Sequence, residues 1–108
     1  MEEILEQWDQ ILQESPMLLV QLGTESCMPC HALRKKILSW QQGHSAAAYR
    51  YVDLEQERAL ASQLGIFTVP ALILYVHGRE TLRRCGVFSL EEFLRRTERY
   101  EALLQQED

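Results

Sequence analysis

The fold of this chain is decided by residues 17–42, which read MLLVQLGTESCMPCHALRKKILSWQQ. The stretch begins with a short, mostly apolar run, passes through a polar loop, and ends in a segment with apolar residues such as Leu33 and Ile37 at helical spacing. A short apolar run bounded by turn residues is typical of a buried strand, and the second pattern is typical of an amphipathic helix. The stretch therefore predicts a strand that leads through a loop into a helix, with Cys27 and Cys30 at the start of that helix.

The rest of the chain supplies the other elements of an α/β domain. Proline disfavours helix in the residue before it, so a first helix ends at Ser15-Pro16. Ser89 followed by Glu92 forms a capping box, which predicts the start of a last helix. We expect helices at residues 2–14, 28–42 and 55–64 and after Ser89, and strands at residues 17–22, 48–53, 71–76 and 80–85.

This order of elements predicts how the strands pair. A strand–helix–strand unit favours a parallel pair with a right-handed crossover. The closing strands are joined by a tight turn at His77-Gly78 and should be antiparallel. We therefore predict an α/β fold with a four-stranded mixed sheet that is flanked by helices on both faces.

Length and composition limit the possible functions. The 108 residues are expected to form one domain over residues 1–108. A net charge of −5 argues against a nucleic-acid partner, because phosphate binding requires a basic surface. No apolar run approaches the roughly 18 residues of a membrane span, so no membrane partner is expected. The acidic start, MEEILEQ, does not resemble a secretory signal, which favours a cytoplasmic location.

The strongest functional signal is the pair of cysteines in Cys27-Met28-Pro29-Cys30. The unpaired N–H groups and positive dipole end at a helix start favour a thiolate, and the thiolate is the reactive form of cysteine. The pattern predicts that Cys27 attacks a substrate disulfide and that Cys30 resolves the mixed disulfide. Two alternatives remain: inert thiols, or a structural zinc site. Zinc requires four ligands, for which the only further candidates are Cys85, His31, His44 and His77.

Together with the cysteine motif, a second motif gives the chain a family resemblance. Thr68-Val69-Pro70 comes forty residues after Cys30, and it is followed by an apolar strand, the turn at His77-Gly78 and then Gly86. In this register the chain resembles the thioredoxin family over nearly its whole length. The resemblance implies a thioredoxin-like fold and a protein-disulfide reductase.

The resemblance also implies a site and its partners. Met28, Pro29, Val69, Pro70 and Gly86 are expected to form the substrate-binding surface beside the catalytic cysteines, with a cis Val69–Pro70 bond. The expected substrates are disulfides of proteins or small molecules. A separate disulfide reductase would restore the dithiol, and no cofactor or metal is expected.

Several residues depart from the family pattern. The tryptophan that usually precedes the first cysteine is Ser26 here, and the usual buried aspartate, which is thought to help move a proton as the second cysteine attacks, is Gln21. A lysine that often pairs with that aspartate is Tyr51, and a proline that kinks the active-site helix in many relatives is Arg34. The first strand of longer members is not expected here, because a helix starts at once. These changes leave the disulfide chemistry in place.

Two other interpretations of the same sequence compete with the reductase. One is a binding module whose groove beside Pro70 holds a partner, and the other is a redox sensor. Cys85 is expected near Pro70, either as a small buried hydrophobic residue or as a third reactive thiol. His31 is expected to point to solvent from the first helical turn.

Overall fold

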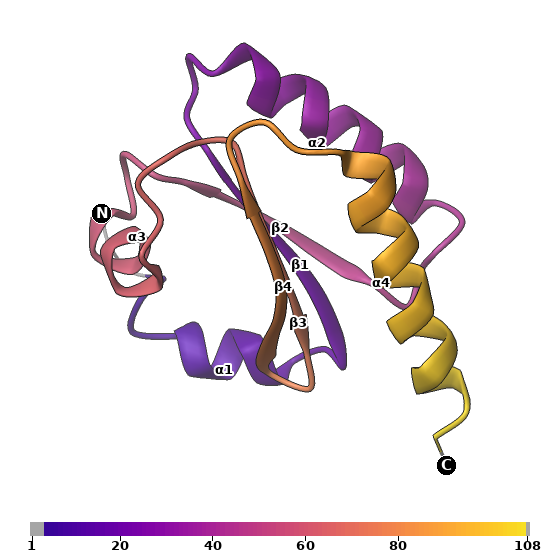
Figure 1. Ribbon diagram of the computed structural model, residues 1–108. Coiled ribbons are helices and arrows are strands. Elements are labelled where there is room, and N and C mark those ends of the chain that lie inside the picture. Colours follow the sequence, from indigo (N-terminus) through magenta and orange to yellow (C-terminus); the bar gives the residue numbers. More distant parts are fainter. Residues whose placement is uncertain (1–3, 108) are drawn as a thin grey trace.

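The computed structural model describes residues 4–107 and forms a central sheet with helices on both faces (Figure 1). The predicted element order, α-β-α-β-α-β-β-α, is confirmed. The helices are α1 (Trp8–Gln13), α2 (Met28–Gln41), α3 (Arg58–Leu64) and α4 (Leu90–Gln105), and the strands are β1 (Met17–Gly23), β2 (Ala48–Asp53), β3 (Ala71–Val76) and β4 (Arg79–Cys85).

The sheet has the predicted mixed topology, with strand order β2-β1-β3-β4. Strand β1 pairs in parallel with β2 and antiparallel with β3, and β4 pairs antiparallel with β3. The turn between β3 and β4 places His77 at φ 52° and Gly78 at φ 79°, the left-handed conformation that a tight two-residue hairpin requires. Because β1 is a central strand, all seven of its residues are buried.

Two hydrophobic clusters fill the space on the two faces of the sheet. Helices α1 and α3 cover one face, and α2 and α4 cover the other (Figure 1). Trp8 and Leu60 belong to the first cluster, and Ile37 and Phe93 belong to the second. The alternation of side chains along β1 sends Val20 into the first cluster and Leu19 into the second.

A polar contact ties the carboxyl end of α2 to α4. The Trp40 indole donates a hydrogen bond to Glu98 at 2.8 Å, and its ring stacks on the His44 imidazole with ring centres 4.2 Å apart. The His44 ring lies 2.7 Å from a carboxylate oxygen of Glu101. These contacts fix the helix that begins at the cysteine pair against the last helix of the fold.

Two predicted helices begin later than the sequence suggested. The helix predicted at residues 2–14 begins at Trp8, and residues 4–7 form turns closed by backbone bonds from Gln7 to Ile4 and from Trp8 to Leu5; residues 1–3 lie outside the described residues. The helix predicted at residues 55–64 begins at Arg58. The Asp53 carboxylate accepts hydrogen bonds from the N–H groups of Glu55 and Gln56 and so holds a turn before the helix. Hydrophobic spacing alone does not register such turns.

Within residues 4–107, none of the helices has both the length and the apolar character that crossing a membrane would demand.

The last helix begins as predicted, since the Ser89 hydroxyl accepts a hydrogen bond from the Glu92 N–H at 3.1 Å. In the same described range, no strand precedes β1, in agreement with the shortened start expected from the sequence.

Candidate active site

Cys27 occupies the N-cap of α2, at the end of the loop that leaves β1. Its backbone is extended, with φ −84° and ψ 100°, and its sulfur accepts a hydrogen bond from the Cys30 N–H at 3.2 Å. Pro29 lies in the first turn, where its missing N–H removes no helical bond. A sulfur at this position meets a backbone donor and the positive end of the helix dipole, which both stabilise a thiolate.

Cys27 and Cys30 differ in their access to solvent. They form a disulfide, with Cα atoms 5.2 Å apart, so one helical turn brings the two sulfurs together. Cys27 is partly exposed, whereas Cys30 is completely buried. A substrate disulfide in solution can therefore meet the sulfur of Cys27, whereas Cys30 presents no exposed surface.

A buried polar network lies beneath the cysteine pair. Gln21 is completely buried on β1, and its amide nitrogen donates to the Cys30 backbone carbonyl at 2.9 Å. The amide oxygen accepts a hydrogen bond from the Tyr49 hydroxyl at 2.6 Å. Both ends of the amide are thus bonded, and burial raises the pKa of Tyr49, so the phenol stays protonated as the donor. Leaving one such buried group unpaired costs about 1–3 kcal/mol.

This network differs from the pairing that the resemblance implied. Tyr51 stands beside Gln21 in the register of β1 and β2, in the place of the family's lysine, but the side-chain partner of Gln21 is Tyr49. The Tyr51 hydroxyl donates instead to the carbonyl of Thr24 at 3.4 Å. The two tyrosines share one face of β2 because they are two residues apart, and only the structure distinguishes their roles.

The cysteine motif and the second motif meet at an apolar pocket of about 350 Å³. The Val69–Pro70 bond is cis, as expected, and the chain turns there into β3. Among the residues assigned from sequence, Pro29, Val69, Pro70 and Gly86 line the pocket, whereas Met28 is 74% exposed and does not. Three further lining residues were not assigned to the site from the sequence: Leu33, Val87 and Phe88.

Gly86 closes one side of this pocket. Its φ of 75° lies in the left-handed region that favours glycine, and its N–H donates to the Pro70 carbonyl at 2.8 Å. Cys85 precedes Gly86 and is paired with Ala71 in the β3–β4 ladder. Because Ala71 directly follows Pro70, Cys85 lies close to Pro70 in space, as expected. Cys85 is free and exposed, however, and the prediction of a small buried residue was wrong, because β4 is an edge strand.

His31 is partly exposed in the first turn of α2, and its ring has a partner that the sequence did not predict. Its Nε2 lies 2.7 Å from the Glu25 carbonyl and donates to it in an exposed hydrogen bond. The contact joins the first turn of α2 to the loop that carries Cys27. Helical periodicity could not reveal this contact, because the partner is a backbone oxygen.

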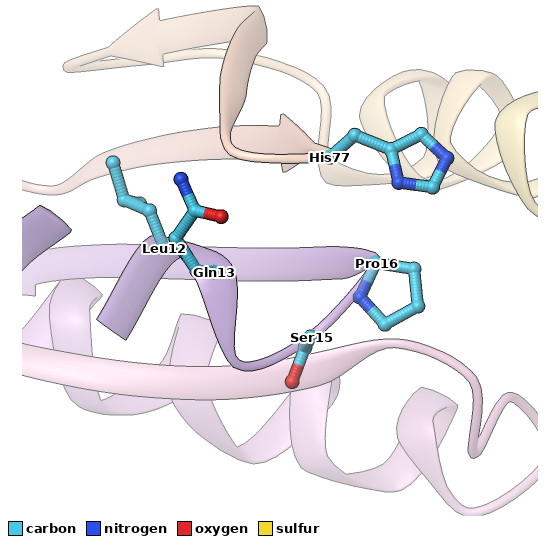
Figure 2. A pocket seen from close by; sticks show the side chains of 5 residues that line it. All are labelled: Leu12, Gln13, Ser15, Pro16 and His77. Carbon is cyan, nitrogen blue, oxygen red and sulfur yellow. The ribbon is translucent and has the colours of Figure 1, made fainter. Parts of the chain in front are cut away.

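Other concave sites lie away from the cysteine pair. Figure 2 shows a pocket at the opposite end of β1, lined by residues from α1, the segment between α1 and β1, and the hairpin turn. The His77 ring points away from the Leu12 and Gln13 side chains there, and it bonds Glu107 at 3.0 Å. Across residues 4–107, no cluster of three or more His, Cys, Asp or Glu side chains is arranged to hold a metal ion.

Known proteins place this site in a family. The family model described as Thioredoxin matches residues 2–98. A thioredoxin from Chlamydia caviae is 28% identical over 79 residues, covering 73% of this chain and 78% of that protein. Thioredoxin-1 from Schizosaccharomyces pombe is 26% identical over 70 residues, covering 65% of this chain and 68% of that protein.

Solved structures agree with this match at the level of the fold. A mutant thioredoxin from Halobacterium salinarum superposes with a TM-score of 0.79 at 23% identity, covering 89% of this chain and 84% of that one. Thioredoxin 1 from Thermosipho africanus gives a TM-score of 0.75 at 22% identity, covering 82% and 99% of the two chains.

The chain belongs to the thioredoxin family. It is a thiol–disulfide oxidoreductase of the protein-disulfide reductase type, and Cys27 and Cys30 are its redox-active pair.

The unequal exposure of the cysteines predicts unequal reactivity. In the reduced protein at neutral pH, iodoacetamide should modify Cys27 at least about tenfold faster than Cys30, because exposure and helix-start donors favour its thiolate. Peptide mass mapping separates both from the exposed Cys85. After unfolding in denaturant the two rates should become similar, and faster labelling of Cys30 in the folded protein would contradict the assignment.

The neutral network predicts an effect of restoring a carboxylate. Gln21→Asp should accelerate the attack of Cys30 on a mixed disulfide at pH 7 by at least about tenfold, because a carboxylate can accept the Cys30 proton and an amide cannot. Single-turnover kinetics between pH 6 and 9 measure this step. Gln21→Asn, whose neutral side chain matches aspartate in size, is the control and should not accelerate this step. Equal rates for Gln21→Asp and wild type at every pH would exclude a role for this position in proton transfer.

The same substitution should reduce stability. The shorter carboxylate loses the bond to the Cys30 carbonyl, which costs about 1–3 kcal/mol of unfolding free energy. Burial raises the pKa of a carboxyl above its unfolded value, so the folded state binds more protons and the stability of Gln21→Asp falls as pH rises between the two pKa values. Urea unfolding at several pH values, compared with Gln21→Asn, measures the part due to charge.

Proposed function

We propose that Cys27 is the nucleophile, that Cys30 is the resolving cysteine, and that the substrate is the disulfide of an extended peptide bound beside cis-Pro70. The observation that carries the division of roles is the contrast between a partly exposed Cys27 sulfur, which accepts the Cys30 N–H, and a completely buried Cys30.

The proposed reaction has two thiol–disulfide exchanges. The Cys27 thiolate attacks one sulfur of the substrate disulfide, forms a mixed disulfide, and releases the other substrate sulfur as a thiolate. Cys30, after losing its proton to solvent, attacks the Cys27 sulfur and releases the second substrate thiolate. The substrate gains two electrons, and the protein is left with the Cys27–Cys30 disulfide.

The apolar surface around Cys27 supports a protein substrate. Pro29, Val69 and Val87 line the pocket beside the cysteine pair, and Met28 stands exposed between the two cysteines. Such a surface gains most from contact with apolar peptide side chains on either side of a disulfide. Small-molecule disulfides are a second substrate class, since they require access to Cys27 alone.

The protein also requires a source of electrons and a reducing compartment. A separate disulfide reductase would return the pair to the dithiol after each turnover, and a reducing compartment such as the cytoplasm suits a protein that must be re-reduced. A partner-binding or redox-sensing module is the alternative, in which the same groove holds a partner and turnover is secondary.

Reduction of insulin disulfides with dithiothreitol as the electron donor tests the proposal. Wild type should accelerate insulin precipitation, and Cys27→Ser should lose essentially all of that acceleration. Cys30→Ser should accumulate mixed disulfides with substrate, because attack can begin but cannot be resolved. Cys85→Ser serves as the control and should match wild type. Stable partner capture without any acceleration of insulin reduction would instead support the binding module.

A further inference from the structure

The Tyr51 hydroxyl and the Cys30 side chain both pack closely against Gly23. It is the last residue of β1, and a β-carbon added there would touch the Tyr51 hydroxyl and would lie 2.9 Å from both Cβ and Sγ of Cys30. These approaches are closer than real β-carbons show. The absence of a side chain at Gly23 therefore allows the phenol oxygen and the sulfur to occupy one small space.

The Tyr51 hydroxyl is held near Cys30 but is weakly bonded. Its hydrogen bond to the Thr24 carbonyl is 3.4 Å long, well beyond the usual length for a hydroxyl donor. The guanidinium of Arg34 lies over the phenol ring, 4.9 Å from its centre, and fixes the ring from the side of α2. A rotation of the hydroxyl can thus redirect its proton at little cost.

The Cys30 sulfur needs a donor when it reacts. It is completely buried, and an anion that is buried without a hydrogen bond is strongly disfavoured. The hydrogen bond that the Gln21 amide nitrogen makes here runs to the Cys30 carbonyl and not to the sulfur, and the amide oxygen accepts from Tyr49. The Tyr51 hydroxyl and the Cys30 sulfur both lie within 3 Å of the position that a Gly23 β-carbon would occupy, so the phenol is a side-chain donor close to this sulfur.

The surroundings of Tyr51, and its burial above all, keep the phenol a donor and not a base. Burial and the nearby Asp53 raise its pKa, while Arg34 lowers it, and the net direction is upward. Tyr49, two residues earlier on the same strand, is protonated as well. The phenol is therefore neutral throughout the pH range in which a thiol titrates.

We propose that Tyr51 donates a hydrogen bond to the Cys30 thiolate and so promotes resolution of the mixed disulfide, with Gly23 as the opening that admits the phenol. The idea rests on the proposed roles of the two cysteines. Cys30 gives its proton to solvent water, the phenol turns from the Thr24 carbonyl to Sγ, and the thiolate attacks Cys27. The Cys27–substrate bond breaks, and the substrate leaves as a thiolate.

The test uses the aromatic disulfide dithiobis(nitrobenzoate), in a Cys85→Ser background that removes the exposed third thiol. Each reduced protein molecule releases one coloured thiolate when Cys27 attacks and a second when Cys30 resolves, so stopped-flow absorbance separates the two steps. Tyr51→Phe should raise the pH midpoint of the second release by about one unit and slow it about tenfold at pH 7, with the first release unchanged.

Two further variants complete the design. Gly23→Ala should reproduce the shift, because the added carbon displaces the phenol; if this variant does not fold, Tyr51→Phe decides alone. Tyr49→Phe is the comparison variant, which breaks the bond to Gln21 and leaves the Tyr51 phenol in place, so its midpoint should shift less than that of Tyr51→Phe.

A second-release profile for Tyr51→Phe that superimposes on the parent would overturn the proposal. An equal shift in Tyr49→Phe would also overturn it, because the effect would then belong to the network around Gln21. Loss of the second release at every pH in the parent protein would contradict the proposed cysteine roles instead, so the two failures are distinguishable.

Discussion

The hydrogen bond from Gln21 to the Cys30 carbonyl joins the central strand of the sheet to the first turn of the helix that carries the site. It anchors the first turn of α2 to β1 at the place where Cys30 is buried and Cys27 is partly exposed. The bond is strong in context, because both partners lie where water cannot replace it. The Tyr49 hydroxyl orients the amide, and the contact of Trp40 and His44 with α4 holds the far end of the same helix.

The departures from the family pattern form a connected group in space. Gln21, Tyr51 and Arg34 are distant in sequence, yet Gln21 and Tyr51 are neighbours in the strand register, and Arg34 lies over the Tyr51 ring. Gln21 and Tyr51 replace a buried acid and its basic partner by neutral hydrogen-bonding groups beneath the cysteine pair, and Arg34 replaces the family's helix proline. A neutral environment avoids the cost of desolvating a carboxylate, and in the proposed reaction Cys30 releases its proton to solvent while the phenol supplies a hydrogen bond to the thiolate.

The sequence predicted the strands well, because their signals are local and strong. The apolar run in β3 and the alternating tyrosines in β2 each correspond to an observed strand, and the cysteine motif lies at the predicted strand-to-helix junction. The second motif correctly predicted the cis bond before Pro70 through the family's spacing. Helix starts were less predictable, since side-chain and backbone bonds in turns decide them.

Contacts between distant segments could not be predicted from the sequence. The choice of Tyr49 as the partner of Gln21, the approach of Tyr51 to Gly23, and the pocket walls from Leu33 and Phe88 depend on how α2 and the loop after β4 pack on the sheet. The exposure of Cys85 likewise follows from the position of β4 at the sheet edge, which strand patterning alone does not give.

Cys27 and Cys30 act as one dithiol–disulfide couple. The couple is tested by equilibrating the Cys85→Ser protein, which lacks the exposed third thiol, with glutathione buffers of graded ratio, followed by acid quench, alkylation and intact mass measurement. We expect one transition, in which two thiols disappear together and no glutathione is added to the protein mass. The ratio of reduced to oxidised protein should follow the square of the glutathione concentration divided by the concentration of glutathione disulfide. Stable adducts of glutathione on Cys27, with Cys30 remaining a free thiol across the range, would contradict it.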